Sequence, residues 1–380
     1  MFVSGLVQGR RVKTHYETVA YRAATGARLW ASSYQPGGNL YSYPVALTVS
    51  PDGARVYVST DFHFIGRGQG VVTFAYDART GRQLWASRYR PKDSGARVSG
   101  LAVSPDGTTL YLAGTLGQAH SLFFGVIAYS AATGKQRWLR YYTKVKPGYA
   151  ESVAVSPDGK TVYATGSAGS SALTVAYGAA GTLKWAARYK DPYGFAAGSQ
   201  IVAAPGGGAV YVAGTAANIN GHFDVATFAY RAATGRRMWV DRHYARITAV
   251  AGAPEIAVTP GGQTVILTVP LNHGTSYAIA AYNASTGGTR WAMLAPDTYG
   301  DPSGLVINPH GDTMFIGGNR TTAYSVADGT VLWTTSYNRN FPVGFLSGII
   351  GLSGDGARLF GTRQTKRGIT WSIIIVAYRT

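Results

Sequence analysis

One short pattern recurs eight times along the chain and constrains the fold more than any other feature. Its clearest copy reads AYDARTGRQLWASRY, with Tyr76, Thr80, Gly81 and Trp85 at the spacing Tyr-x3-Thr-Gly-x3-Trp. A second pattern, Ser-Pro-Asp-Gly followed by a β-rich run, alternates with it, and the motif tryptophans lie 42 to 55 residues apart. Repeats of roughly 40 to 50 residues built from short strands are typical of a β-propeller. The sequence therefore predicts an all-β fold, a single β-propeller of four-stranded antiparallel blades.

Residues 98–142 show how one repeat forms a blade of four strands, here named A to D. VSGLAVSP, TTLYLAGT, LFFGVIAYS and KQRWLRYY are apolar or alternating runs, and Asp-Gly or Thr-Gly turns join A to B and C to D. The turn glycines are expected to supply positive φ, and the turn aspartates to bond their own backbone. The tryptophans are expected to pack between neighbouring blades, with each indole N–H donating to a carbonyl.

The two ends of the chain carry incomplete repeats. Residues 1–34 lack the inner strand A, and residues 345–380 lack the outer strand D. The B–C hairpins predict eight blades in one domain over residues 1–380, with a D–A segment missing upstream of Met1. The alternative is seven blades, with terminal strands pairing across the seam.

The charge balance limits the classes of partner. The chain has 35 Lys+Arg against 17 Asp+Glu, a formal net charge of +18, which attracts polyanions. Two B–C loops are locally basic and would be neighbours if the blades close into a ring; together they hold Arg10, Arg11, Lys13, Arg363, Lys366 and Arg367. The alternative is that these are solvated loops on an arginine-rich surface. No nucleic-acid recognition module is visible, so we expect no specific nucleic-acid partner.

The absence of cysteine excludes disulfides, thiolate chemistry and Cys-based metal sites. The seven histidines show no metal-site spacing, so no metal site is expected. No apolar stretch reaches the length of a membrane helix, and the N-terminus lacks the apolar core of a signal peptide. We expect a monomer without a membrane span.

Two surfaces are candidates for function. The start of each A strand is expected to line the mouth of the central channel, at the position six residues before the turn proline or one residue later: Ser99, Glu151, Ser199, Glu255 and Ser303. Two carboxylates there suit an acid–base pair or a cation site; the alternative is that they pair with arginines.

The second candidate surface is formed by the D–A loops. These loops are rich in aromatic residues, among them Tyr193 and Phe195, and also carry acids such as Asp191. Aromatic rings beside hydrogen-bonding groups suit sugars or peptides; the alternative is that the rings pack the loops onto the blades.

The paired motifs A-Y-[DRSN]-A-x-T-G-x-x-x-W and A-V-S-P-D-G-x-x-[VL]-Y resemble the PQQ-like propeller repeats of the quinoprotein-like superfamily, as found in secreted actinobacterial proteins. The resemblance implies either a scaffold or a quinone-dependent dehydrogenase. Seven of the 17 acids stand in or near A–B and C–D turns, so we expect a non-catalytic binding or scaffold protein for a polymer, glycan or protein partner, without a cofactor. The alternatives are a PQQ-dependent oxidoreductase with calcium and a polyanion binder through the basic loops. The expected location is the bacterial cell surface or the extracellular space.

Overall fold

The computed structural model describes residues 1–7, 15–34, 40–64, 68–91, 94–118, 120–220, 222–243, 252–271, 276–295, 302, 304–318, 320–336, 350–353, 355–367 and 370–380. These residues form antiparallel strands and turns, and none of them lies in a helix that could span a membrane. The chain divides into two compact units, Met1–Lys190 and Asp191–Thr380.

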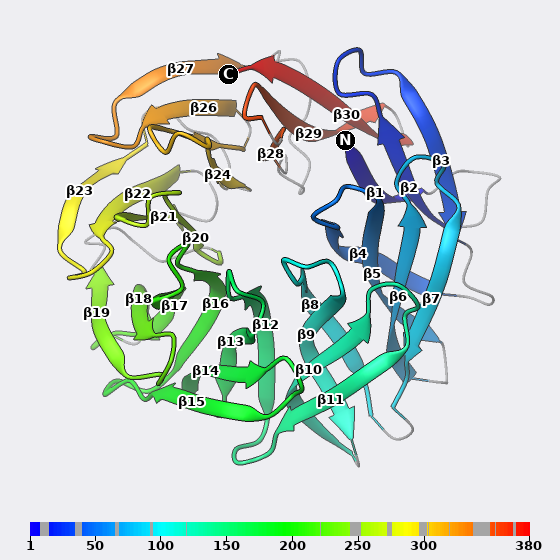
Figure 1. Ribbon diagram of the computed structural model, residues 1–380. Helices are drawn as coiled ribbons and strands as arrows, with labels where there is room; N and C mark the ends of the chain where they lie inside the picture. Colours follow the sequence, from blue (N-terminus) through cyan, green and yellow to red (C-terminus); the bar gives the residue numbers. More distant parts are fainter. Residues whose placement is uncertain are drawn as a thin grey trace. The chain divides into compact units, whose positions relative to one another are not determined.

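The first unit holds four sheets, each built from consecutive strands (Figure 1). In chain order they are β1 (Phe2–Val7), β2 (His15–Tyr21) and β3 (Arg28–Tyr34); β4 (Leu40–Val49), β5 (Arg55–Phe64), β6 (Gly68–Asp77) and β7 (Gln83–Tyr89); β8 (Ala96–Val103), β9 (Thr109–Gln118), β10 (Ser121–Ser130) and β11 (Gln136–Tyr142); and β12 (Gly148–Val155), β13 (Thr161–Ala168), β14 (Ser171–Gly178) and β15 (Leu183–Tyr189).

The second unit also holds four sheets with the same consecutive strand order. They are β16 (Ala196–Ala203), β17 (Ala209–Ala217), β18 (Phe223–Arg231) and β19 (Arg237–His243); β20 (Glu255–Val258), β21 (Thr264–Leu271), β22 (Ser276–Asn283) and β23 (Thr289–Leu294); β24 (Leu305–Ile307), β25 (Thr313–Ile316), β26 (Arg320–Ser325) and β27 (Val331–Ser336); and β28 (Ile350–Leu352), β29 (Arg358–Arg367) and β30 (Thr370–Arg379).

These eight sheets confirm the predicted all-β, eight-bladed β-propeller class. Six sheets have four strands, while β1–β3 and β28–β30 have three. Within each unit, the first strands of successive sheets contact one another, as β4 contacts β8 and β16 contacts β20. The candidate residues on these first strands, which apart from β1 are the A strands of the repeat, therefore come from neighbouring blades within each unit.

The repeated tryptophans join neighbouring sheets as the sequence predicts. The indole N–H groups of Trp30, Trp85, Trp138, Trp239 and Trp291 donate to a carbonyl of the following sheet over 2.8–3.1 Å. The glycine of the next Thr-Gly turn lies directly over the indole ring, and a Cβ built on Gly134 would stand 2.5 Å from Trp85. Gly134 has φ of +70°, so this glycine is required both by the turn and by the ring beneath it.

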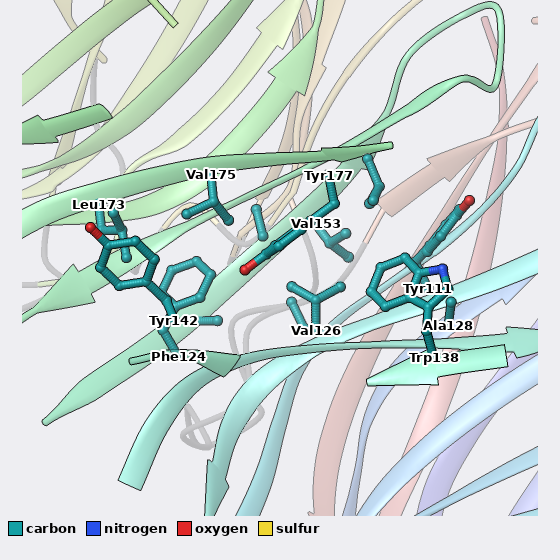
Figure 2. Packing of buried hydrophobic residues seen from close by; sticks show 14 of the residues in the cluster. Tyr111, Phe124, Val126, Ala128, Trp138, Tyr142, Val153, Leu173, Val175 and Tyr177 are labelled. Carbon is teal, nitrogen blue, oxygen red and sulfur yellow. The ribbon is translucent and has the colours of Figure 1, made fainter. Parts of the chain in front are cut away.

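Buried apolar side chains fill the space between successive sheets. Figure 2 shows the cluster between β8–β11 and β12–β15, where Phe124 and Val126 of one sheet face Leu173, Val175 and Tyr177 of the next. The indole of Trp138 lies 5.8 Å from the ring of Tyr111 and 6.0 Å from that of Tyr177. This packing fixes the loops and strand starts that carry the candidate sites.

Candidate functional site

In the sheets that begin with β4, β8, β12 and β16, the residue expected at the channel mouth lies at a β-bulge. In four A–B strand pairs the register shifts at one residue of the A strand, which leaves Val45, Ser99, Glu151 and Ser199 without a direct partner. A bulge adds one residue to a strand and redirects its side chain. The position six residues before the turn proline is therefore the bulged residue of the A strand. The spacing predicted this position, but the sequence did not predict the bulge.

Glycines on the B strand make room for three of these bulges. A Cβ built on Gly114, Gly166 or Gly214 would collide with a carbonyl oxygen of the bulged A strand. The glycines are thus required by close approach of two backbones, not by positive φ.

Ser99 and Glu151 belong to a polar cluster that also includes Asp61 and Arg97. Asp61 Oδ1 accepts a hydrogen bond of 2.7 Å from the Val98 amide, and Asp61 Oδ2 lies 3.7 Å from Arg97 Nε. Burial raises the pKa of Asp61 to about 6, while the Val98 amide and Arg97 oppose that rise. Glu151 is exposed to solvent, yet desolvation by the surrounding strands still raises its pKa, against the influence of Arg97 and of a hydrogen bond from Ser99.

A related contact ties the A strands of the second unit together. The amide of Ile256 donates to Gln200 Oε1 over 3.1 Å. Burial raises the pKa of Glu255 to about 7, and a hydrogen bond from the Leu305 amide opposes the rise. Asp61, Gln200 and Glu255 thus each offer a side-chain oxygen to the A strand of the following sheet. The carboxyl groups of Asp61 and Glu255, with pKa values of about 6 and 7, can exchange a proton near neutral pH. Their contacts, however, are with backbone amides and join one A strand to its neighbouring sheet.

Several predicted residues lie outside the part of the chain that the structure describes. One of them is Ser303. The others are the basic residues of the two B–C loops, Arg10, Arg11 and Lys13 and the side chains of Arg363, Lys366 and Arg367, so the basic patch stays a prediction. Glu151 belongs to the first unit and Glu255 to the second. The turn acids have the structural role that was expected: Asp52, Asp106, Asp158 and Asp355 each accept a hydrogen bond of 2.5–2.6 Å from the serine two residues before.

A second candidate site lies on the loops around the sheet β16–β19. Tyr193, Phe195 and Phe223 are 46%, 37% and 46% exposed, and Ile219 is 71% exposed. The rings of Phe195 and Phe223 meet edge to face with their centroids 5.8 Å apart. We call these four residues the aromatic shelf. The sequence singled out Tyr193 and Phe195, but missed Ile219 and Phe223, which come from the B–C loop and the start of β18.

A buried ion pair holds the first loop of the shelf. Asp191 Oδ2 lies 3.2 Å from Arg242 Nη2, and the two side chains are 0% and 15% exposed. Asp191 Oδ1 also accepts a hydrogen bond of 2.9 Å from the Tyr193 amide. The Arg242 guanidinium covers the Tyr193 ring at 5.5 Å from its centroid, and it donates to the carbonyl of Ala217.

A second buried aspartate holds the other loop. Asp224 Oδ1 accepts a hydrogen bond of 2.9 Å from Asn218 Nδ2. Asn218 Oδ1 in turn accepts hydrogen bonds of 3.0 Å from the amides of Asn220 and His222. The Ala217 amide donates to Phe195 O over 2.7 Å and joins the two loops. The exposed rings are therefore carried by loops whose conformation is fixed from beneath.

The donor set for a quinone with calcium can be tested on the described part of the chain. Calcium requires six to eight oxygen ligands with several carboxylates, but the described residues bring no three His, Asp or Glu side chains together. Asp61 and Glu151 each interact electrostatically with Arg97, which opposes the rise in the pKa of both carboxyl groups. These residues do not fit the group, and we derive no step through it.

Comparisons with known proteins agree with the architecture. A family model described as outer membrane protein assembly factor BamB matches residues 68–335. Among solved structures, a chain of hydrazine synthase from Kuenenia stuttgartiensis is similar, with a TM-score of 0.57 and 15% identity over 89% of this chain and 95% of that chain. No curated protein sequence matches.

The likeness to hydrazine synthase shows a shared fold alone, because the identity is low. The narrower resemblance to secreted actinobacterial proteins stays a prediction. The family match spans more than half of the 380 residues, so the chain belongs to the PQQ-like repeat family whose model is described as outer membrane protein assembly factor BamB.

Proposed function

We propose that the protein is a non-catalytic binding protein that holds its partner on the aromatic shelf. The observation that carries the proposal is the exposure of Tyr193, Phe195 and Phe223 on loops fixed by the buried side chains of Asp191 and Asp224. Rings of this size are normally buried, and contiguous exposed apolar surface marks interaction sites in soluble proteins. The two buried aspartates hold the loops that carry these rings, through contacts with Arg242, the Tyr193 amide and Asn218.

The acids with raised pKa values support binding over catalysis. Asp61 and Glu255 are engaged with backbone amides of the next sheet, which is a structural role. A scaffold role also agrees with the family description, which names an assembly factor. We extend the proposal to location: the protein acts at the surface of a bacterial cell or outside it, which immunodetection in cell fractions tests.

The alternative is a PQQ-dependent oxidoreductase, and tryptophan fluorescence separates the two. We would titrate the protein with pyrroloquinoline quinone, with and without calcium, at low salt and at about 0.5 M NaCl, where exposed charges are screened. We expect any quenching at low salt to disappear at high salt, because the net charge of +18 attracts an anionic quinone. Saturable, calcium-dependent binding at high salt, together with dye-linked oxidation of an alcohol or aldose, would overturn the non-catalytic proposal.

A further inference from the structure

We infer that the aromatic shelf binds neutral saccharide chains. The inference rests on the proposed function and names the class of ligand. The first observation that supports it is the charge of the side chains near the shelf. The charged side chains beneath the shelf are withdrawn from solvent: Asp191 and Asp224 are 1% and 4% exposed, and Arg242 is paired with Asp191. The four side chains of the shelf are themselves uncharged, and the exposed Lys190 directly precedes Asp191 in the sequence.

The groups that the two loops do expose are aromatic rings and neutral polar groups. Asn220 and His222 are exposed between Ile219 and Phe223. One face of a sugar ring presents polarised C–H groups, which pack on the negative face of an aromatic ring, while its hydroxyls exchange hydrogen bonds with amide and imidazole groups. An apolar peptide can meet the Asn220 amide and the His222 imidazole only with its backbone N–H and C=O groups, whereas a sugar presents hydroxyl groups around the whole ring. The combination of groups favours a saccharide over such a peptide.

The rigidity of the shelf suits a ligand that makes few contacts. Tyr193 is held by the guanidinium of Arg242 on its ring and by Asp191 on its amide. Phe195 and Phe223 hold each other through their edge-to-face contact. Side chains that are already ordered lose little conformational entropy on binding, so a small stacking surface retains more of its interaction free energy. The rings of Phe195 and Phe223 are nearly perpendicular, at 83°, so we expect one sugar ring to stack on the face of one of them while the next sugar contacts the edge of the other.

The test is calorimetric titration with maltohexaose, cellohexaose, mannohexaose and chitohexaose in about 0.5 M NaCl, a concentration that removes nonspecific charge effects. We expect at least one to bind, and Tyr193→Ala and Phe223→Ala each to weaken it by about tenfold or more, as loss of a central aromatic contact does. The matched control is Leu294→Ala, which removes a side chain of 54% exposure on β23, outside the shelf. Circular dichroism and the midpoint of thermal unfolding verify that each variant is folded.

Three results would overturn the inference. The first is that no hexasaccharide binds. The second is that one binds equally well to wild type and to both ring variants. The third is that an apolar peptide library binds to the shelf and both ring variants abolish that binding; this outcome would leave the proposed function standing and remove only the saccharide. Saturable, calcium-dependent quinone binding at high salt, together with dye-linked oxidation of an alcohol or aldose, would instead remove the proposed function, so the two failures are distinguishable.

Discussion

Glu255 makes the stability of the protein depend on pH. Burial raises its pKa from the ordinary 4.5 to about 7, so between these values the folded protein holds a proton that the unfolded chain has released. The free energy of unfolding should therefore fall as the pH rises from about 5 to about 8. Glu255→Gln keeps an oxygen for the Leu305 amide and removes the charge. We expect it to be more stable than wild type at pH 8 by about 1–3 kcal/mol and nearly equal at pH 5.

Urea unfolding at the two pH values measures this difference. Glu17→Gln on β2 is the control, because it removes the same carboxylate elsewhere in the chain. A Glu255→Gln variant with the pH dependence of wild type would show that burial does not penalise the ionised carboxylate.

Asp61 provides a second comparison, which separates a hydrogen bond from a charge. Asp61→Asn keeps Oδ1 as an acceptor for the Val98 amide, whereas Asp61→Ala leaves that amide without its partner. Burial raises the pKa of Asp61 to about 6, so at pH 7 the ionised carboxylate destabilises the folded state, and we expect Asp61→Asn to raise the free energy of unfolding by about 1–3 kcal/mol. Asp61→Ala removes the same charge but also the acceptor of the Val98 amide, so we expect it to be less stable than Asp61→Asn by about 1–3 kcal/mol. Chemical denaturation at pH 7 measures both. Equal free energies of unfolding in the two variants would mean that the hydrogen bond from the Val98 amide does not stabilise the contact of β5 with β8.

At the scale of the element, the Thr-Gly turn and the tryptophan beneath it act as one unit. Gly134 and Gly53 have nearly the same φ, +70° and +69°, but a Cβ at Gly134 would stand 2.5 Å from Trp85, while a Cβ at Gly53 would meet nothing within 4 Å. Both alanine variants incur the left-handed backbone penalty of about 1–2 kcal/mol. We expect Gly134→Ala to lose a further 1–3 kcal/mol or so from overpacking. Thermal unfolding of both variants measures the difference. Equal losses would show that the contact with the ring carries no specific energy.

Strand order and turns were predictable because they are local and repeated. Each blade repeats the same apolar alternation and the same turn residues. The pattern can therefore be recognised from the eight repeats together even though each single repeat departs from it. The bulged position was found by its distance from the turn proline, which is also local. Asp61 was missed because it occupies a B-strand position where other repeats have Thr115, Ser167 or Thr215, and only the next sheet gives it a partner.

The aromatic shelf was only half visible in the sequence for the same physical reason. Asp191 and Arg242 are 51 residues apart, and Phe195 and Phe223 are 28 apart. No periodicity relates these pairs, because Asp191 and Phe195 lie in a D–A loop, and the lengths of these loops differ between repeats. The one available signal was the density of aromatic residues in the D–A loops. That signal identified rings, but it could not indicate which of them are exposed.

At the scale of the whole molecule, the net charge of +18 attracts anionic polymers. We expect the protein to bind an anionic polymer such as polyphosphate at low salt and to release it by about 0.5 M NaCl, since scattered exposed charges are then screened. Tyr193→Ala should not alter this binding, because the shelf exposes no cation among its described residues. Retention on a polyphosphate column at increasing salt measures it. Salt-resistant retention, lost when Arg10, Arg11 and Lys13 are replaced by alanine, would instead establish a dedicated basic site.

Hydrogen–deuterium exchange of the intact chain, with and without a mixture of neutral hexasaccharides, tests most directly where the molecule binds. In the free protein we expect slow exchange at Tyr193 and Ala217, whose amides bond Asp191 Oδ1 and Phe195 O. With saccharide present, further protection should appear in residues 191–195 and 217–223. Rapid exchange of both amides in the free protein would contradict a preorganised shelf. Protection that appears only at the inner strands around Ser99, Glu151 or Glu255 would place the binding site there instead.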